Sequence, residues 1–176
     1  TLHNFGGGQP SSQWHPGFSN SQYPTFIYAL NDKIAMLNTV YPDHNFYLDA
    51  IVINQGERET ATGVDWSGNW TAFINKIREL YGADVNVIIE ALATDFMNYG
   101  AVDHVASTRA HQDAIITGSG HVDELVNVYL SDGNDLPALG GVAGSSLTDG
   151  GVHYNREGHR LLGEQTFGVY KTIKGF

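Results

Sequence analysis

The stretch YLDAIVIN, residues 47–54, decides the fold that this sequence predicts. It is a short, nearly continuous apolar run, and residues 85–92, VNVIIEAL, form a second run of the same kind. Strands with this pattern are buried on both faces, which is typical of a parallel sheet that helices cover on its two sides. Residues 125–130 predict a last strand, so the sequence indicates a parallel sheet at the centre of the molecule.

Helical patterns lie between and after these strands. Apolar residues recur at helical spacing in two segments, first at Phe26, Leu30, Ile34 and Leu37, then at Trp70, Phe73, Ile74, Ile77 and Leu80. The first helix is expected to stop before Tyr41-Pro42 and the second at Gly82. Residues 102–116 form a weaker helical pattern, and Asn155 is a good N-cap for a last helix. This alternation predicts an α/β fold, a three-layer α/β/α sandwich with a parallel sheet.

The composition is that of one globular domain over residues 1–176, with 41% hydrophobic residues and 21 glycines. The formal net charge is −10 with only nine Lys plus Arg, so we expect no nucleic-acid partner and no basic contact with a membrane. No apolar run approaches the roughly 20 residues of a membrane span. Cysteine is absent, which excludes thiol catalysis. A neutral, hydroxyl-rich substrate such as a glycan is compatible with this composition.

Three polar motifs are candidates for a ligand-binding site. They are GGGQPSSQW at residues 6–14, INQGE at residues 53–57 and DGGVHYN at residues 149–155. Ligands of such sheets bind beyond the carboxyl ends of the strands, so the second and third motifs are expected to meet at one edge. A glycine-rich turn, a polar loop and an acid close to a histidine supply oxyanion donors, a base and an orienting carboxylate. These are the parts of an acyl-transfer site.

In order and wording these motifs resemble the SGNH (GDSL-like) hydrolases, in particular the branch with carbohydrate esterase family 6 and the sialate O-acetylesterases. Residues 7–14 align without a gap with a family block that reads Gly-Gly-Thr-Ser-x-x-Gln-Trp. Gln55-Gly56-Glu57 matches the next block, and Val152-His153-Tyr154-Asn155 followed by Gly158 matches the last. The resemblance extends from Gly7 to about Gly163 and implies a flavodoxin-like SGNH domain.

The resemblance implies a serine-type ester hydrolase that removes O-acetyl groups from a carbohydrate, such as an acetylxylan or an acetylated sialate, without a cofactor. It implies a general base and two acids that support it, namely His153, Asp149 and Glu57. It implies oxyanion donors at Gly7, Gly8 and Gln55. Contacts with the acetylated glycan are expected from Trp14 and Asn54. An extracellular or periplasmic location is expected for such an enzyme.

The sequence departs from the family pattern in two places. The Gly-Gln-Ser block that carries the family's nucleophile is not found ahead of Gly7, so we expect the serine and the first strand on an upstream segment or companion chain. Ser11 and Ser12 are weaker candidates, because they fall within the second block and no strand precedes them. Asp149 lies one residue further from His153 than is usual, which a left-handed glycine between them could absorb. We therefore expect Glu57 to matter at least as much as Asp149.

A second class of protein is also compatible with the motifs: an esterase-like domain without a nucleophile that only recognises glycans. The motif residues have simpler interpretations as well. His153 would then be an ordinary surface histidine, and Glu57 a solvated carboxylate. The Gln55 amide would tie down its own loop, and Trp14 would be a packing residue.

No cofactor or metal is expected from the remaining motifs. The glycines at positions 6–8 lack the Lys-Ser/Thr of a phosphate-binding loop. The histidine pairs His104 with His111 and His3 with His15 do not form a compact two-histidine-plus-acid pattern for a metal ion.

Overall fold

The computed structural model describes residues 10–56, 65–91, 102–132, 148–149, 153–154 and 156–176. In chain order these residues form the 3-10 helix η1 (Ser11–Trp14), α1 (Tyr23–Val40), β1 (Ala50–Ile53), α3 (Trp66–Tyr81), β2 (Asn86–Ala91), α4 (Val102–Ala114), β3 (Val128–Asp132), β4 (Thr148–Asp149), β5 (His153–Tyr154) and α5 (Arg156–Lys174).

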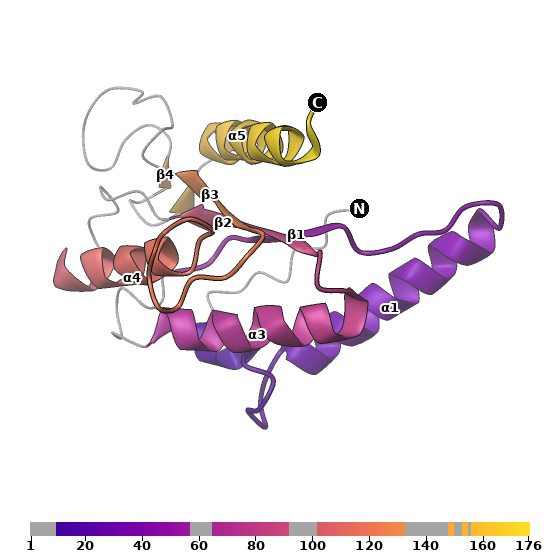
Figure 1. The fold of residues 1–176 in the computed structure, drawn as a ribbon, viewed down its shortest axis with the longest axis horizontal. Helices are drawn as coiled ribbons and strands as arrows, with labels where there is room; N and C mark the ends of the chain where they lie inside the picture. Colours follow the sequence, from indigo (N-terminus) through magenta and orange to yellow (C-terminus); the bar gives the residue numbers. More distant parts are fainter. Residues whose placement is uncertain (1–9, 57–64, 92–101, 133–147, 150–152, 155) are drawn as a thin grey trace.

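A parallel sheet with the order β1-β2-β3 lies at the centre of the described structure. Helix α5 lies on one face of the sheet, and α1, α3 and α4 lie on the other (Figure 1). The predicted α/β class and the predicted parallel sheet are therefore confirmed. A second, antiparallel pair of strands, β4 and β5, was not indicated by the sequence.

Helix α3 supplies most of the core on its side of the sheet. Its inner face buries Trp66, Trp70, Phe73, Ile74 and Ile77 against alternate residues of the strands, namely Ile51, Ile53, Val87, Ile89 and Val128. Alternate strand residues share one face of a sheet, so this set is the one that the strand pattern predicts. The helix ends at Tyr81, and its C-cap Gly82 has a φ of +116°, a conformation that glycine adopts readily.

Helix α5 covers the opposite face over β2 and β3. Leu162 is buried there, and Thr166 Oγ1 donates a hydrogen bond to Glu90 Oε1 over 2.7 Å. Coverage is uneven across the sheet, because Ile88 of β2 is 1% exposed whereas Val52, its register partner on β1, is 45% exposed. One face of β1 is therefore open to solvent in the described structure.

Helix α1 packs on the core through its first turns, where Phe26 and Ile27 lie against the buried cluster. Figure 1 shows its later turns extending past the end of α3. Met36 and Val40 in these turns are exposed. Among the helices within the described ranges, none combines the length and apolar character that crossing a membrane requires.

Candidate functional site

The second motif follows the carboxyl end of β1, as the sequence predicts. Asn54 is exposed there, whereas Gln55 and Gly56 are buried. The backbone of Gly56 has a φ of +152°, which residues with a side chain rarely adopt. This position therefore requires glycine.

Two tryptophans of α3 bind the side chain of Gln55. Its Oε1 atom accepts a hydrogen bond from Trp66 Nε1 over 2.8 Å and another from Trp70 Nε1 over 3.1 Å. The two tryptophans are four residues apart on a helix, so their rings lie on the same face. We call this arrangement the indole pair.

The backbone carbonyl of Gln55 is held as well. It accepts from Trp66 Nε1 and from Gln112 Nε2 of α4, each over 3.2 Å. Gln112 is fully buried and Gln55 is 9% exposed. Groups from two helices thus position both the main chain and the side chain of Gln55, as a buried polar residue requires.

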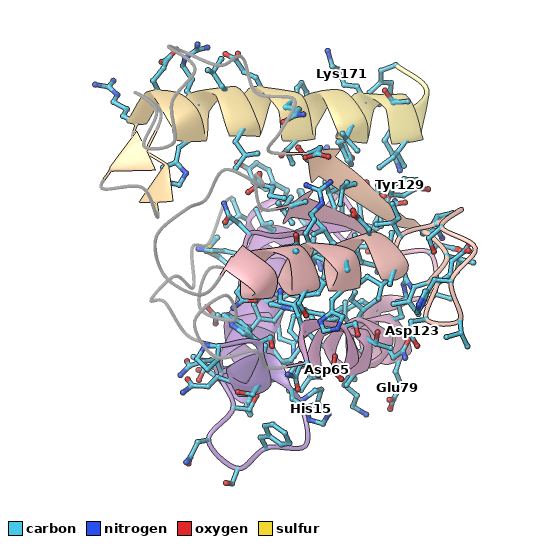
Figure 2. All side chains as sticks on the ribbon, turned by 90° about the vertical axis from the view of Figure 1, so that its left-hand side faces the viewer. His15, Asp65, Glu79, Asp123, Tyr129 and Lys171 are labelled. Atoms are coloured by element: carbon cyan, nitrogen blue, oxygen red, sulfur yellow. The ribbon has the colours of Figure 1, made fainter. Side chains whose placement is uncertain are left out.

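The first turn of α3 positions Trp66 at the start of the helix. Asp65 is the N-cap, and its Oδ1 accepts from the backbone N–H of Gly68 and from Ser67 Oγ, each over 3.0 Å. The hydrogen bond from Gly68 is the main reason that the pKa of the Asp65 carboxyl lies below its ordinary value. Figure 2 shows Asp65 and His15 far from Lys171 on α5, on the α3 side of the molecule.

Residues of the first motif pack beneath the same turn. Ser11 is 0% exposed, and its Oγ accepts from Asn69 Nδ2 over 3.0 Å, while the same nitrogen donates to the Asp65 carbonyl over 2.7 Å. A fully buried hydroxyl held in this way is not presented to a substrate. The structure therefore gives Ser11 a role in tying η1 to α3 and disfavours it as a nucleophile.

Trp14 is also buried, and its ring stacks on Trp70 with the centroids 5.8 Å apart. Phe26 and Phe73 lie edge-on to it at 6.3 and 6.1 Å. The packing role that the sequence left open for Trp14 is thus present, and contact with a sugar stays a prediction. Through Trp70 the first motif supports the residue that holds Gln55.

The third motif contains a backbone pairing that bears on the spacing of Asp149 and His153. Strands β4 and β5 are antiparallel, and Asp149 is the register partner of His153. Asp149 and His153 therefore lie opposite each other in this strand pair, even with the additional residue between them. Strand β5 packs against α5, which follows it directly.

The remaining predicted site residues, Gly7, Gly8 and Glu57, lie outside the described residues, as does the proposed N-cap Asn155. His15 is described, and its Nδ1 accepts from the backbone N–H of Gly17 over 3.0 Å while its ring stacks on Phe18. Within the described ranges, no three His, Asp or Glu side chains gather closely enough to hold a metal ion.

The sequence did not predict Trp66 and Gln112, which bind Gln55, or Asn69, which binds Ser11. A signal for Trp66 was available, because Asp65 is a strong N-cap type and the tryptophans at 66 and 70 have helical spacing. Nothing in the sequence indicates the contacts of Asn69 and Gln112, which join segments far apart along the chain.

Compared with known proteins, the chain gives no significant match to a family model, to a curated protein or to a solved structure.

Proposed function

We propose that this protein is a serine-type ester hydrolase of the SGNH class that removes O-acetyl groups from a carbohydrate. The observation that carries the proposal is Gln55 at the carboxyl end of β1, where its side-chain Oε1 accepts from both indole N–H groups. Because both indoles donate to the amide oxygen, the amide nitrogen is the end of the side chain that the proposal assigns to the oxyanion. An amide N–H held rigidly at the carboxyl edge of a parallel sheet is a suitable oxyanion donor.

The chemistry would proceed through two acyl transfers. A serine oxygen attacks the acetyl carbonyl, His153 accepts the serine proton, and the carbonyl oxygen becomes an anion that accepts from Gln55 Nε2 and from the N–H of Gly7 or Gly8. The intermediate collapses, and His153 gives the proton to the departing sugar oxygen. Water then attacks the acetyl-serine while His153 takes a proton from it, and His153 returns that proton to the serine oxygen as its bond to the acetyl carbon breaks and acetate leaves.

Asp149 and Glu57 would stabilise the imidazolium that forms when His153 takes the proton. The register pairing of Asp149 with His153 supports a role for Asp149 despite its longer spacing. Either carboxylate would hold the imidazole in the tautomer that leaves one nitrogen available to the serine. Asn54, exposed beside Gln55, would contact the glycan.

The proposal takes its nucleophile from an added strand beside β1. The residues of β1 are Ala50, Ile51, Val52 and Ile53, a pattern typical of a strand buried on both faces. Within the described residues β1 pairs with β2 alone, and Val52 is half exposed. A parallel strand added at this edge would end next to Gln55, which is where the serine is required.

A non-catalytic module that binds glycans is the second candidate. The burial of Ser11 favours the binding module, because that serine of the first motif is not presented to a substrate. The two candidates differ in whether a nucleophile is supplied by an upstream segment or companion chain.

Hydrolysis of 4-nitrophenyl acetate by the complete native assembly separates the candidates. The proposal predicts turnover that His153→Ala abolishes while the circular-dichroism spectrum is unchanged. Turnover that survives His153→Ala contradicts the mechanism. An assembly that binds an acetylated glycan but hydrolyses neither that glycan's acetyl ester nor 4-nitrophenyl acetate is the binding module.

A further inference from the structure

We propose that the rings of His15 and Phe18 form a platform on which one sugar of a neutral glycan stacks. The sequence predicts glycan contact from Trp14, whose ring is buried, and the structure presents Phe18 of the following loop instead. This inference rests on the proposed function and makes it more specific, because it selects a neutral glycan such as acetylxylan over an acidic one such as an acetylated sialate.

The two rings are stacked on each other. Their centroids are 4.5 Å apart, and their planes make an angle of 26°. Phe18 is 50% exposed, so its apolar ring stands partly in water with the imidazole packed against it. A sugar ring has faces made of C–H groups, and stacking such a face on an aromatic ring removes apolar surface of both from water. We call these two side chains the aromatic platform.

The loop that carries the aromatic platform is held by its own hydrogen bonds. The backbone N–H of Gln22 donates to the Gln13 carbonyl over 2.6 Å, and Ser21 Oγ donates to the same oxygen over 3.0 Å. Within the loop, the N–H of Phe18 donates to the His15 carbonyl over 3.2 Å, and the N–H of Ser21 donates to the Phe18 carbonyl over 3.1 Å. The rings are thus in place before a ligand arrives, which lowers the entropic cost of binding.

The chemistry of the loop favours a neutral sugar. Residues 15–21, HPGFSNS, contain no Lys, Arg, Asp or Glu. The backbone N–H of Gly17 donates to His15 Nδ1 over 3.0 Å, so the ring proton is on Nε2, where it is a donor for a hydroxyl group. Ser19 and Asn20 are exposed and add neutral donors and acceptors. A carboxylate on the sugar would meet no positive charge from this loop and a chain with a net charge of −10.

The loop begins next to the residues that hold Gln55. It follows η1, which packs on α3. Trp14, the last residue of η1, stacks on Trp70, whose indole N–H binds Gln55. Figure 2 shows His15 on the α3 side of the molecule, away from Lys171 on α5. An oligosaccharide, and not a single sugar, is therefore the ligand that would contact both the platform and the residues beside Gln55.

Isothermal titration of the complete native assembly with xylohexaose tests the platform independently of activity. Xylohexaose is uncharged, and its sugar rings carry their hydroxyls equatorially, so their faces are apolar. We expect Phe18→Ala to weaken binding about tenfold and Phe18→Trp to preserve it, because the aromatic face is what the sugar contacts. An unsubstituted assembly that does not bind xylohexaose, or a Phe18→Ala assembly that binds it equally tightly, overturns the inference.

Phe167→Ala is the matched control. Phe167 is 58% exposed on α5, where Lys171 Nζ lies 5.4 Å from its ring centroid. Because α5 lies on the other face of the sheet (Figure 1), we expect this variant to bind xylohexaose with unchanged affinity. Equal weakening in the two alanine variants contradicts a specific platform. Tighter binding of sialyllactose than of xylohexaose contradicts the choice of a neutral glycan.

Two esters distinguish failure of this inference from failure of the proposed function. Acetylated xylohexaose has sugar rings for the platform, whereas 4-nitrophenyl acetate has none. We expect the ratio of kcat/KM for the first to kcat/KM for the second to fall about tenfold in Phe18→Ala and to stay unchanged in Phe167→Ala. An unchanged ratio in Phe18→Ala overturns the inference alone. Binding of xylohexaose that depends on Phe18, without hydrolysis of either ester, overturns the proposed function and leaves the platform as part of a binding module.

Discussion

Gly56 is the residue whose backbone most constrains the candidate site. At a φ of +152° a side chain is strained, and such strain costs about 1–3 kcal/mol. We expect Gly56→Ala to lower the free energy of unfolding by this amount in urea titrations. The change also strains the backbone next to Gln55, so turnover should fall further than the loss of stability explains.

Gly163→Ala is the matched control. Gly163 lies within α5, where an added Cβ would meet no atom within 4 Å, and its φ is not in the left-handed region. Alanine is favoured over glycine in a helix interior by about 1 kcal/mol, so this variant should be as stable as the parent or more so. If Gly56→Ala proves as stable as Gly163→Ala, the strain at the turn is refuted.

Asp65 gives a pH-dependent prediction. Its pKa is lowered in the folded state, so its contribution to stability is fully present above its ordinary value of 3.8 and is lost as the pH falls through the lower folded-state pKa. Asp65→Ala should cost about 1 kcal/mol at neutral pH, as an N-cap does, with the difference from the parent shrinking in acid. Urea titrations of both proteins across this range measure it. A difference that stays constant in acid contradicts the assignment of the ionised cap.

The two candidate acids can be compared directly. Because Asp149 is the register partner of His153, we expect Asp149→Asn to impair ester turnover as severely as Glu57→Gln, with the fold intact in both. The measurement is kcat for 4-nitrophenyl acetate in the complete assembly. A nearly normal Glu57→Gln enzyme beside an inactive Asp149→Asn enzyme would assign the role to Asp149 alone.

At the scale of elements, β1 has the sequence of an interior strand and, among the described residues, the pairing of an edge strand. Exposed apolar edges of this kind attract further strands. We expect its backbone amides to exchange more slowly with deuterium in the complete assembly than in the isolated 176-residue chain, because an added strand would occupy the open edge. The amides of β2, which has a neighbour on each side, serve as the internal control. Equal exchange of β1 in both samples contradicts the added strand.

Element boundaries show where sequence reasoning succeeds and where it stops. The apolar spacing predicts a helix ending before Tyr41, and α1 does end at Val40. The last strand of the main sheet begins at Val128 and not at residue 125, because Asn127 has a φ of +54° and interrupts the extended backbone. Helix α3 begins at Trp66, four residues before the apolar stripe, since the Asp65 cap determines its start.

At the scale of the whole molecule, the α/β class and the parallel sheet follow from the strand and helix patterns. So does the placement of Gln55 at a strand end, since that depends only on chain order. The indole pair does not follow from the sequence, because it joins Gln55 to residues 11 and 15 positions away through a tertiary contact. The burial of Ser11 depends likewise on Asn69, which is 58 positions away.

We propose that a serine outside the described residues completes a site that contains Gln55 and His153. Labelling the complete native assembly with a fluorophosphonate, followed by peptide mass spectrometry, tests it most directly, because the reagent bonds to activated serines. We expect one labelled serine, on an added segment or chain that pairs with β1, and no label in the His153→Ala assembly. A label on Ser11 or Ser12, or an active assembly that takes up no label, would contradict it.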